Sequence, residues 1–257
     1  MSKVITIIPA RMASSRLPNK PLLDINGKPL IQRVYENVKK SIKGDVVIAA
    51  GDKEIADAAK KFGAKVVLTD PKLPSGTDRI AAALEKIDPD GKKYDIVVDF
   101  QGDGLNVDPK VNLDLIKMVE KTGCDIATCG MKFKRKKDIK DPSMVKICMG
   151  LREGEDEGRS LYFTRSAAPY VRNPEKPVNQ DYYHHIGIYV FKADSLKKMV
   201  KLPVGVLEER ESLEQLRALE NGMQIRAKIV KNMKLNKKAP ADINTPEEYQ
   251  EALKWIK

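Results

Sequence analysis

The feature that most constrains the fold is a regular alternation, in the first half of the chain, between short apolar runs and amphipathic segments. The apolar runs have the length of buried strands and lie at 4–8, 45–50, 64–69 and 94–100. The segments between them repeat apolar residues as one face of a helix does; the first such face consists of Leu30, Ile31, Val34, Tyr35 and Val38. This alternation predicts a parallel sheet covered by helices on both faces, with ligands bound at the carboxyl ends of the strands.

The alternation loosens after about residue 124, which predicts a mixed second half. Strands are expected at 125–133, 144–148, 161–164, 185–191 and 223–230, with a helix-rich stretch at 206–221. A final helix is well marked, because Thr245 suits the N-cap, Pro246 the first helical position and Glu248 a capping box. We therefore predict an α/β fold, doubly wound with a mainly parallel central sheet, and a mixed α+β second half. No linker or repeat divides the chain, so we expect one domain over 1–257, with halves 1–123 and 124–257.

Composition excludes several classes of protein. Of the 257 residues, 42% are hydrophobic and 32% are charged, which is typical of a globular chain and not of a disordered one. No apolar run approaches the roughly 20 residues that a membrane span needs, so membrane insertion is not expected. The first residues indicate a strand and not a signal peptide. The cysteines, Cys124, Cys129 and Cys148, are odd in number and lack metal-ligand spacing, which fits a reducing cytoplasm.

The chain carries 47 Lys and Arg against 36 Asp and Glu, a formal net charge of +11. Two explanations are open: nucleic-acid binding, or a lysine-rich solvated surface on an enzyme that handles anions. The basic runs at 132–137 and 231–238 favour the first explanation, whereas an aromatic content of 5% and the lack of a nucleic-acid motif count against it. We expect no specific nucleic-acid partner.

The loop after the first predicted strand, residues 9–20, is the most informative segment. This loop leaves the sheet at the edge where a ligand is expected, and it carries three cations, Arg11, Arg16 and Lys20. Fixed cations there suit a triphosphate, although the spacing is not that of a P-loop and a basic surface loop would have the same composition. Asp103 follows the fourth predicted strand beside Gly102, where it is either a Mg²⁺ ligand at the same edge or an ordinary turn residue.

A series of motifs follows this loop in a recognisable order. They are PARMASSRLPNKPL at 9–22, DINGKPLIQRVYENV at 24–38, SGTDR at 75–79, QGD at 101–103, LYFTR at 161–165, HHIGIYVF at 184–191, LEERESLEQLRALENG at 207–222 and NTPEEYQEA at 244–252. Over nearly the whole chain they resemble the sugar nucleotidylyltransferases, in the form typical of 3-deoxy-manno-octulosonate (Kdo) cytidylyltransferases. The resemblance implies a nucleotide-diphospho-sugar transferase-like fold and transfer of CMP from CTP to an acidic 2-keto sugar such as Kdo, with release of pyrophosphate. It also implies a homodimer, in which half 1–123 binds the nucleotide and half 124–257 binds the acceptor and the second subunit.

The resemblance assigns nucleotide contacts to the first loop and to the SGTDR and QGD motifs. The residues concerned are Pro9, Ala10, Arg11, Arg16, Lys20, Ser75, Gly76, Arg79 and Gln101. Arg11, Lys20 and Asp103 are expected to be catalytic, and Lys20 is the candidate for charge neutralisation at the α-phosphate. From the residues alone, Ser75 or Thr77 is equally well read as an ordinary helix N-cap.

The second half is expected to supply the acceptor contacts. These fall on Arg165, which would pair with a substrate carboxylate, and on His185, Glu211, Glu214 and Gln215, which would hydrogen-bond sugar hydroxyls. From the residues alone, His185 on an apolar strand also fits a core histidine. The 207–220 segment also fits an amphipathic helix whose charges are solvated and whose leucines pack.

Mg²⁺ is the expected cofactor, with Asp103, Asp242 and Asn244 as candidate ligands. The chain departs from the family at this edge, because the family has Asp at position 244, Glu-Pro or Gln-Pro at Gly104 and Leu105, and Ala-Thr-Asp in the loop 49–52. Three readings stay open. Catalysis is retained with altered Mg²⁺ geometry; or the scaffold serves another anionic acceptor, such as a different keto sugar acid or a small phosphonate; or the chain binds nucleotide without catalysis.

Overall fold

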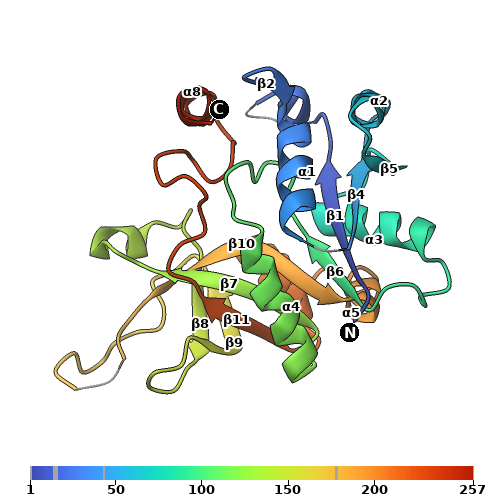
Figure 1. The fold of residues 1–257 in the computed structure, drawn as a ribbon. Coiled ribbons are helices and arrows are strands. Elements are labelled where there is room, and N and C mark those ends of the chain that lie inside the picture. The colour runs from blue at the N-terminus through green and yellow to red at the C-terminus, as the bar shows by residue number, and fades with distance from the viewer. Residues whose placement is uncertain (1, 14–16, 43, 177–178, 257) are drawn as a thin grey trace. The chain divides into compact units, whose positions relative to one another are not determined.

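The computed structural model describes residues 2–13, 17–42, 44–176 and 179–256 (Figure 1). The chain divides into two compact units, one formed by Met1–Asp114 with Met233–Lys257 and the other by Leu115–Asn232. This division differs from the halves expected from the sequence, because the C-terminal segment returns to the first unit. The side chain of Asn106 links the two parts of that unit: its Nδ2 donates to the carbonyl oxygens of Asn236 (2.7 Å) and Ala239 (3.1 Å), and its Oδ1 accepts from the Asn236 N–H (2.8 Å).

The first unit contains the predicted parallel sheet. Its strands are β1 (Val4–Ala10), β4 (Asp45–Ala50), β5 (Lys65–Leu68) and β6 (Ile96–Asp99), in the order β5-β4-β1-β6. The central strand β1 is in register with both neighbours, and Ile7 lies opposite Val47 on one side and Asp99 on the other. Continuous apolar runs of this kind are expected where both faces of a parallel sheet are covered, and the prediction is confirmed.

Helices cover this sheet on both faces. They are α1 (Leu30–Ser41), α2 (Lys53–Lys61) and α3 (Gly76–Ile87), and the predicted apolar face of α1 is buried. The connections β1-α1-β4 and β4-α2-β5 step in one direction along the sheet, and β5-α3-β6 steps back. Because crossovers of this type are right-handed, α1 and α2 lie on one face and α3 on the other. A 3₁₀ turn, η1 (Lys20–Leu22), and a short hairpin of β2 (Asp24–Ile25) and β3 (Lys28–Pro29) precede α1.

The unit boundary falls within α4 (Lys110–Thr122). The second unit is built on a mixed sheet of β7 (Ile126–Lys132), β8 (Lys146–Gly150), β9 (Glu157–Thr164), β10 (Tyr183–Lys192) and β11 (Ile225–Ile229). Its order is β10-β7-β11-β9-β8, with β7 parallel to β11 and the other neighbours antiparallel. Strand β8 also pairs with β10, through Lys146 and His184, so the sheet curves round on itself.

The helices of the second unit are short. They are η2 (Lys136–Lys140), α5 (Ala193–Met199), α6 (Val206–Glu211) and α7 (Gln215–Glu220). The helix-rich stretch predicted at 206–221 is two helices, because Ser212 adopts a left-handed conformation (φ 51°) that ends α6. Helix α5 was not predicted, since its seven residues are too few for a helical period to emerge.

The C-terminal helix α8 (Pro246–Trp255) begins as its sequence predicts. The Thr245 Oγ1 accepts from the Glu248 N–H (3.3 Å), and the Glu248 carboxylate accepts from the Thr245 N–H (3.0 Å). This reciprocal pair is a capping box, which satisfies N–H groups that a helix start otherwise leaves without partners. Among the helices of the described residues, none has the length and apolar character needed to cross a membrane.

Candidate active site

A cavity of about 320 Å³ opens in the first unit where β1 and β6 end and α3 begins. Its lining consists of Pro9, Ala10, Arg11, Ala13, Lys20, Pro21, Ser75, Gly76, Arg79, Gln101, Gly102, Asp103 and Asn244. Of the nucleotide contacts that the sequence predicts, eight of the nine therefore line one cavity. The ninth, Arg16, lies outside the described residues. The carboxyl edge of a parallel sheet is where such folds bind ligands.

Gly102 allows the walls of this cavity to approach each other. A Cβ atom at this position would lie 2.5 Å from the carbonyl oxygen of Pro9, which is backbone and has little freedom to move. The loops that follow β1 and β6 can therefore meet only if residue 102 has no side chain. The glycine in the QGD motif thus has a packing reason that is independent of the resemblance.

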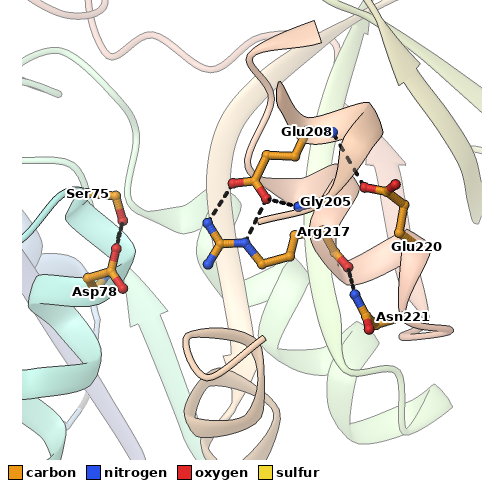
Figure 2. A network of polar contacts seen from close by, with 7 residues as sticks. All are labelled: Ser75, Asp78, Gly205, Glu208, Arg217, Glu220 and Asn221. Carbon is orange, nitrogen blue, oxygen red and sulfur yellow. Dashed lines mark hydrogen bonds and ion pairs between the residues drawn. The ribbon is translucent and has the colours of Figure 1, made fainter. Parts of the chain in front are cut away.

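The N-terminus of α3 forms one wall of the cavity. The Ser75 Oγ accepts from the Asp78 N–H (3.1 Å) and donates to the Asp78 carboxylate (2.6 Å) (Figure 2). The Ser75 side chain is therefore an ordinary N-cap, which is the alternative that the residues alone left open. The positive end of a 12-residue helix remains directed at the cavity edge, where it favours anions.

Arg79 lines the cavity but is committed to the protein. It is 1% exposed, and its Nη1 donates to Thr69 Oγ1 (2.6 Å) and to the carbonyl of Asp70 (3.0 Å). Burial lowers the pKa of Arg79, and the positive charge of Arg11 lowers it further. A Cβ at Gly51 would lie 2.6 Å from Nη1, so this glycine makes room for the guanidinium. Arg79 thus fixes the loop after β5 and contributes its charge to the cavity wall.

Two side chains at the ends of strands organise the cavity in ways that the sequence did not predict. The Asp52 carboxylate accepts from the Met12 N–H (2.7 Å) and so ties down the loop after β1. The Gln101 Nε2 donates to both carboxylate oxygens of buried Asp99, at 2.7 and 2.8 Å. This leaves the Gln101 Oε1 as the polar atom of that side chain available to a ligand. The sequence signal that could have revealed these contacts is an acidic residue at the end of each strand, Asp52 just after β4 and Asp99 as the last residue of β6.

The candidate metal ligands lie together around the ammonium group of Lys20. The Lys20 Nζ is 2.6 Å from Asp103 Oδ2 and 3.1 Å from Asn244 Oδ1, and the Asn244 Nδ2 donates to Asp242 Oδ2 (2.9 Å). Burial and the negative charges of Asp103 and Glu248 raise the pKa of Asp242. The Asp242 residue itself is exposed, so repulsion by the two carboxylates is the main cause of the raised pKa.

This donor set fits a divalent cation only in part. The oxygens of Asp103 and Asn244 converge on one point that a cation already occupies, and hard oxygen donors are those that Mg²⁺ prefers. No three His, Cys, Asp or Glu side chains gather as a metal centre anywhere in the described part of the chain. The set therefore suits an ion that takes its remaining ligands from phosphates and water.

In the second unit, the Arg165 guanidinium is bound to backbone carbonyls. It donates to the carbonyl oxygens of Glu211 (2.6 Å), Pro142 (3.0 Å) and Ser212 (3.2 Å). The free fork that the sequence led us to expect for a substrate carboxylate is thus already engaged. Arg165 joins the end of β9 to the end of α6, and its positive charge is what it can offer a ligand.

His185 is a core residue. It is buried on β10, its Nε2 lies 3.1 Å from Thr128 Oγ1, and its ring packs edge-on against Phe163. Burial, followed by repulsion from His184, lowers the pKa of His185 to about 3, so its ring is neutral at physiological pH. His185 therefore has the surroundings of a core histidine, which is the alternative that the sequence alone left open.

The other predicted acceptor residues lie on or beside α6 and α7. The Glu211 carboxylate accepts from Thr164 Oγ1 (2.6 Å) and from the Arg165 N–H (2.9 Å). Glu214 directly precedes α7, and Gln215 is its first residue. Gln215 is 4% exposed, and its Nε2 has no hydrogen-bond partner among the described residues. A buried amide without a partner is uncommon and needs an explanation.

The chain is similar to known cytidylyltransferases over most of its length. The profile of the cytidylyltransferase family matches residues 5–225. A 3-deoxy-manno-octulosonate cytidylyltransferase of Paramagnetospirillum magneticum is 42% identical over 239 residues, covering 93% of this chain and 94% of that protein. The enzyme of the same description from Rhodospirillum rubrum is 41% identical over 249 residues, covering 96% and 93%. A solved structure of CMP:2-keto-3-deoxy-manno-octonic acid synthetase complexed with CTP is 35% identical, with a TM-score of 0.85 over 98% of both chains.

Proposed function

The chain belongs to the cytidylyltransferase family, and we propose that it transfers CMP from CTP to Kdo, giving CMP-Kdo and pyrophosphate. The resemblance drawn from the motifs is confirmed by relatives that match over nearly their whole length. The observation that carries the proposal is the cavity of the first unit, in which the predicted nucleotide residues meet at the carboxyl edge of a parallel sheet.

The reaction needs positioning and charge neutralisation more than it needs covalent chemistry by the protein. The anomeric hydroxyl of Kdo attacks the α-phosphorus of CTP in line and forms a new O–P bond. The bond from that phosphorus to the oxygen bridging to the β-phosphate breaks, pyrophosphate leaves, and the hydroxyl proton passes to solvent. Lys20 and Arg11 are the cavity cations that we assign to the phosphates, and the N-terminus of α3 supports them.

For the metal, Asp103 and Asn244 are the residues that would hold Mg²⁺, with Asp242 beside them. When bound, the ion would neutralise phosphate charge. Asn244 has the oxygen donor that the site needs but not the negative charge, so the nucleotide must complete the ligation. Lys20 also connects the two loops that carry these oxygens, because its ammonium donates to both.

We assign the acceptor contacts to the second unit, on Glu211, Glu214 and Gln215. Of the other two predicted residues, Arg165 contributes charge and position, because its guanidinium donates to three carbonyls, and His185 contributes shape, because it is buried. The Glu211 carboxylate also has protein partners, but its oxygens have lone pairs for further hydrogen bonds. A homodimer is the assembly that we propose. We place the protein in the cytoplasm, since Cys124, Cys129 and Cys148 are all free thiols.

Pyrophosphate release from each nucleoside triphosphate, with and without Kdo, tests the proposal. We expect release from CTP that depends on Kdo and far less from ATP, GTP or UTP. Equal release from all four nucleotides would refute the assignment of the cavity. Release that requires a different keto sugar acid or a phosphonate would keep the nucleotide half of the proposal and replace the acceptor.

A further inference from the structure

We infer that the buried ion pair between Glu208 and Arg217 positions the acceptor side chains Glu211 and Gln215. The inference rests on the proposed function, because it takes these two side chains as the acceptor contacts. Glu208 and Arg217 themselves would not touch the acceptor. They would act through the geometry of the pair of helices α6 and α7.

The pair is a two-point contact (Figure 2). The Arg217 Nε donates to Glu208 Oε2 at 2.7 Å and its Nη2 donates to Glu208 Oε1 at 2.5 Å, while both side chains are 11% exposed. Burial acts to raise the pKa of Glu208, but the hydrogen bonds from Arg217 and from the Gly205 N–H outweigh it and the pKa is lowered. A planar fork on a carboxylate fixes orientation as well as distance. The pair therefore sets the rotation of α7 relative to α6.

A second set of contacts ties the same two helices together. The Glu220 carboxylate, at the end of α7, accepts from the N–H groups of Leu207 (3.1 Å) and Glu208 (3.4 Å) at the start of α6. A Cβ at Gly205 would overlap the Glu220 carboxylate, so the glycine gives this carboxylate access to the helix start. Figure 2 shows both contacts of Glu208, with the Arg217 guanidinium at its carboxylate and with the Glu220 carboxylate at its backbone.

This rigid pair presents the acceptor residues. Glu211 is the last residue of α6, and its carboxylate is docked on the end of β9 through Thr164 and Arg165. Gln215 is the first residue of α7, and its buried Nε2 lacks a partner within the described part of the chain. Leaving a buried donor unpaired is unfavourable, so the surrounding structure must prevent Gln215 from turning toward another acceptor. The fork between Arg217 and Glu208 acts on the backbone: it fixes the start of α7, from which the Gln215 side chain extends.

Stability alone does not explain such a pair. Replacing a buried ion pair by apolar side chains of similar volume is often neutral or stabilising. A chain that needed only packing between α6 and α7 would therefore do as well with leucine and methionine. Leucine and methionine lack the fixed two-point geometry of the ion pair. We infer that this geometry holds the unpaired Gln215 Nε2 in place for the acceptor.

Arg217→Lys is the first test, because it keeps the charge and loses the fork. We expect KM for Kdo to rise about tenfold, as small misplacements of binding groups typically cause, while KM for CTP stays within about twofold. Gln215→Leu should also raise KM for Kdo, and Arg217→Lys should raise it less in the Gln215→Leu background than in the unaltered protein, because only the effect through Glu211 is left. An unchanged KM for Kdo in Arg217→Lys, or an equal rise in both KM values, would overturn the inference.

The double variant Glu208→Leu with Arg217→Met separates position from stability. We expect a melting temperature equal to or above that of the unaltered protein, together with the raised KM for Kdo. Normal melting with a normal KM for Kdo would show that the pair only packs. If the double variant does not fold, Arg217→Lys decides alone. The matched control is Lys121→Met with Glu157→Gln, which removes an exposed ion pair elsewhere in the second unit and should change neither KM.

The two proposals can fail separately. If the unaltered protein forms no CMP-Kdo, the proposed acceptor is wrong before any variant is compared. The variants are then measured with whichever anionic acceptor the unaltered protein uses. The inference fails if acceptor KM is insensitive to the pair, or if KM for the acceptor and KM for CTP rise equally.

Discussion

Removing the positive charge of Lys20 should strengthen, not weaken, divalent-ion binding by the free protein. The Lys20 Nζ lies 2.6 Å from Asp103 Oδ2 and 3.1 Å from Asn244 Oδ1, the two oxygens that would ligate the ion. An ion can reach them only by displacing the ammonium. Lys20→Met keeps a similar apolar stem and removes this competitor, although the same change should lower turnover because the triphosphate loses a cation.

The size of the effect follows from the exposure of the pair. The side chains of Lys20 and Asp103 are 18% and 23% exposed, so solvent screens the contact only partly. Exposed ion pairs contribute about 0–1 kcal/mol, and hydrogen bonds to charged groups about 1.5–3 kcal/mol. We take the contribution of this half-buried contact to lie between these two ranges, at about 1.4 kcal/mol, and its removal corresponds to roughly a tenfold gain in affinity for the ion.

Electron paramagnetic resonance of free Mn²⁺ measures this directly, without requiring turnover. We expect the Lys20→Met protein to bind Mn²⁺ about tenfold more tightly than the unaltered protein when CTP is absent, and to lose that advantage when CTP is present. Arg11→Met is the matched control, since Arg11 lines the same cavity but in the described structure makes no hydrogen bond to Asp103 or Asn244. Equal gains in both variants would indicate a general field effect, and no gain in Lys20→Met would mean that Asp103 is not a ligand.

Three further predictions concern other positions. His185 is neutral in the folded protein, because its pKa is about 3 there against 6.5 ordinarily. Below pH 6.5 the unfolded chain takes up a proton at this residue and the folded protein does not, so the folded state loses stability as pH falls. Between pH 7 and pH 5 the unfolding free energy, measured by denaturant titration, should therefore drop by about 2 kcal/mol more in the unaltered protein than in His185→Gln. Gly102→Ala places a Cβ against the Pro9 carbonyl, and we expect CTP affinity measured by calorimetry to fall at least about tenfold; unchanged affinity would show that the cavity walls can separate freely. Asn244→Asp restores a carboxylate beside Asp103 and should lower the Mg²⁺ concentration for half-maximal rate, unless Asp242 already serves, in which case Asp242→Asn is the damaging change.

The sequence was sufficient for the elements whose cause is local. Strand β4 spans the apolar run predicted at 45–50, β1 extends two residues past the run predicted at 4–8, and α8 begins at a capping box that needs only four consecutive positions. The position of the cavity could be predicted in the same way, because the carboxyl ends of paired parallel strands lie at one edge of the sheet. No further information was needed to place Arg11 and Asp103 at one edge.

Other features depend on contacts between distant residues and have no local signal. The return of the C-terminal segment rests on Asn106, whose side chain bonds residues about 130 positions further along the chain. The commitment of Arg165 to carbonyls depends on the turn at Ser212, and a left-handed serine is not marked by residue type. Periodicity reports which face of an element is apolar, but it does not report which carbonyl a guanidinium will reach.

The position of the candidate metal ligands depends on backbone contacts between two loops, whereas their charge depends on the residue type. Asn244 carries no charge, yet its side-chain oxygen and that of Asp103 both accept from the Lys20 ammonium, because backbone hydrogen bonds hold the two loops together. The Ile243 N–H donates to the Asp103 carbonyl (3.2 Å), and the Asn106 N–H donates to the Ala241 carbonyl (2.9 Å). Leu105, which lies between Asp103 and Asn106 in the chain, is buried. The geometry of the site is therefore a property of the backbone, and residue 244 sets its charge.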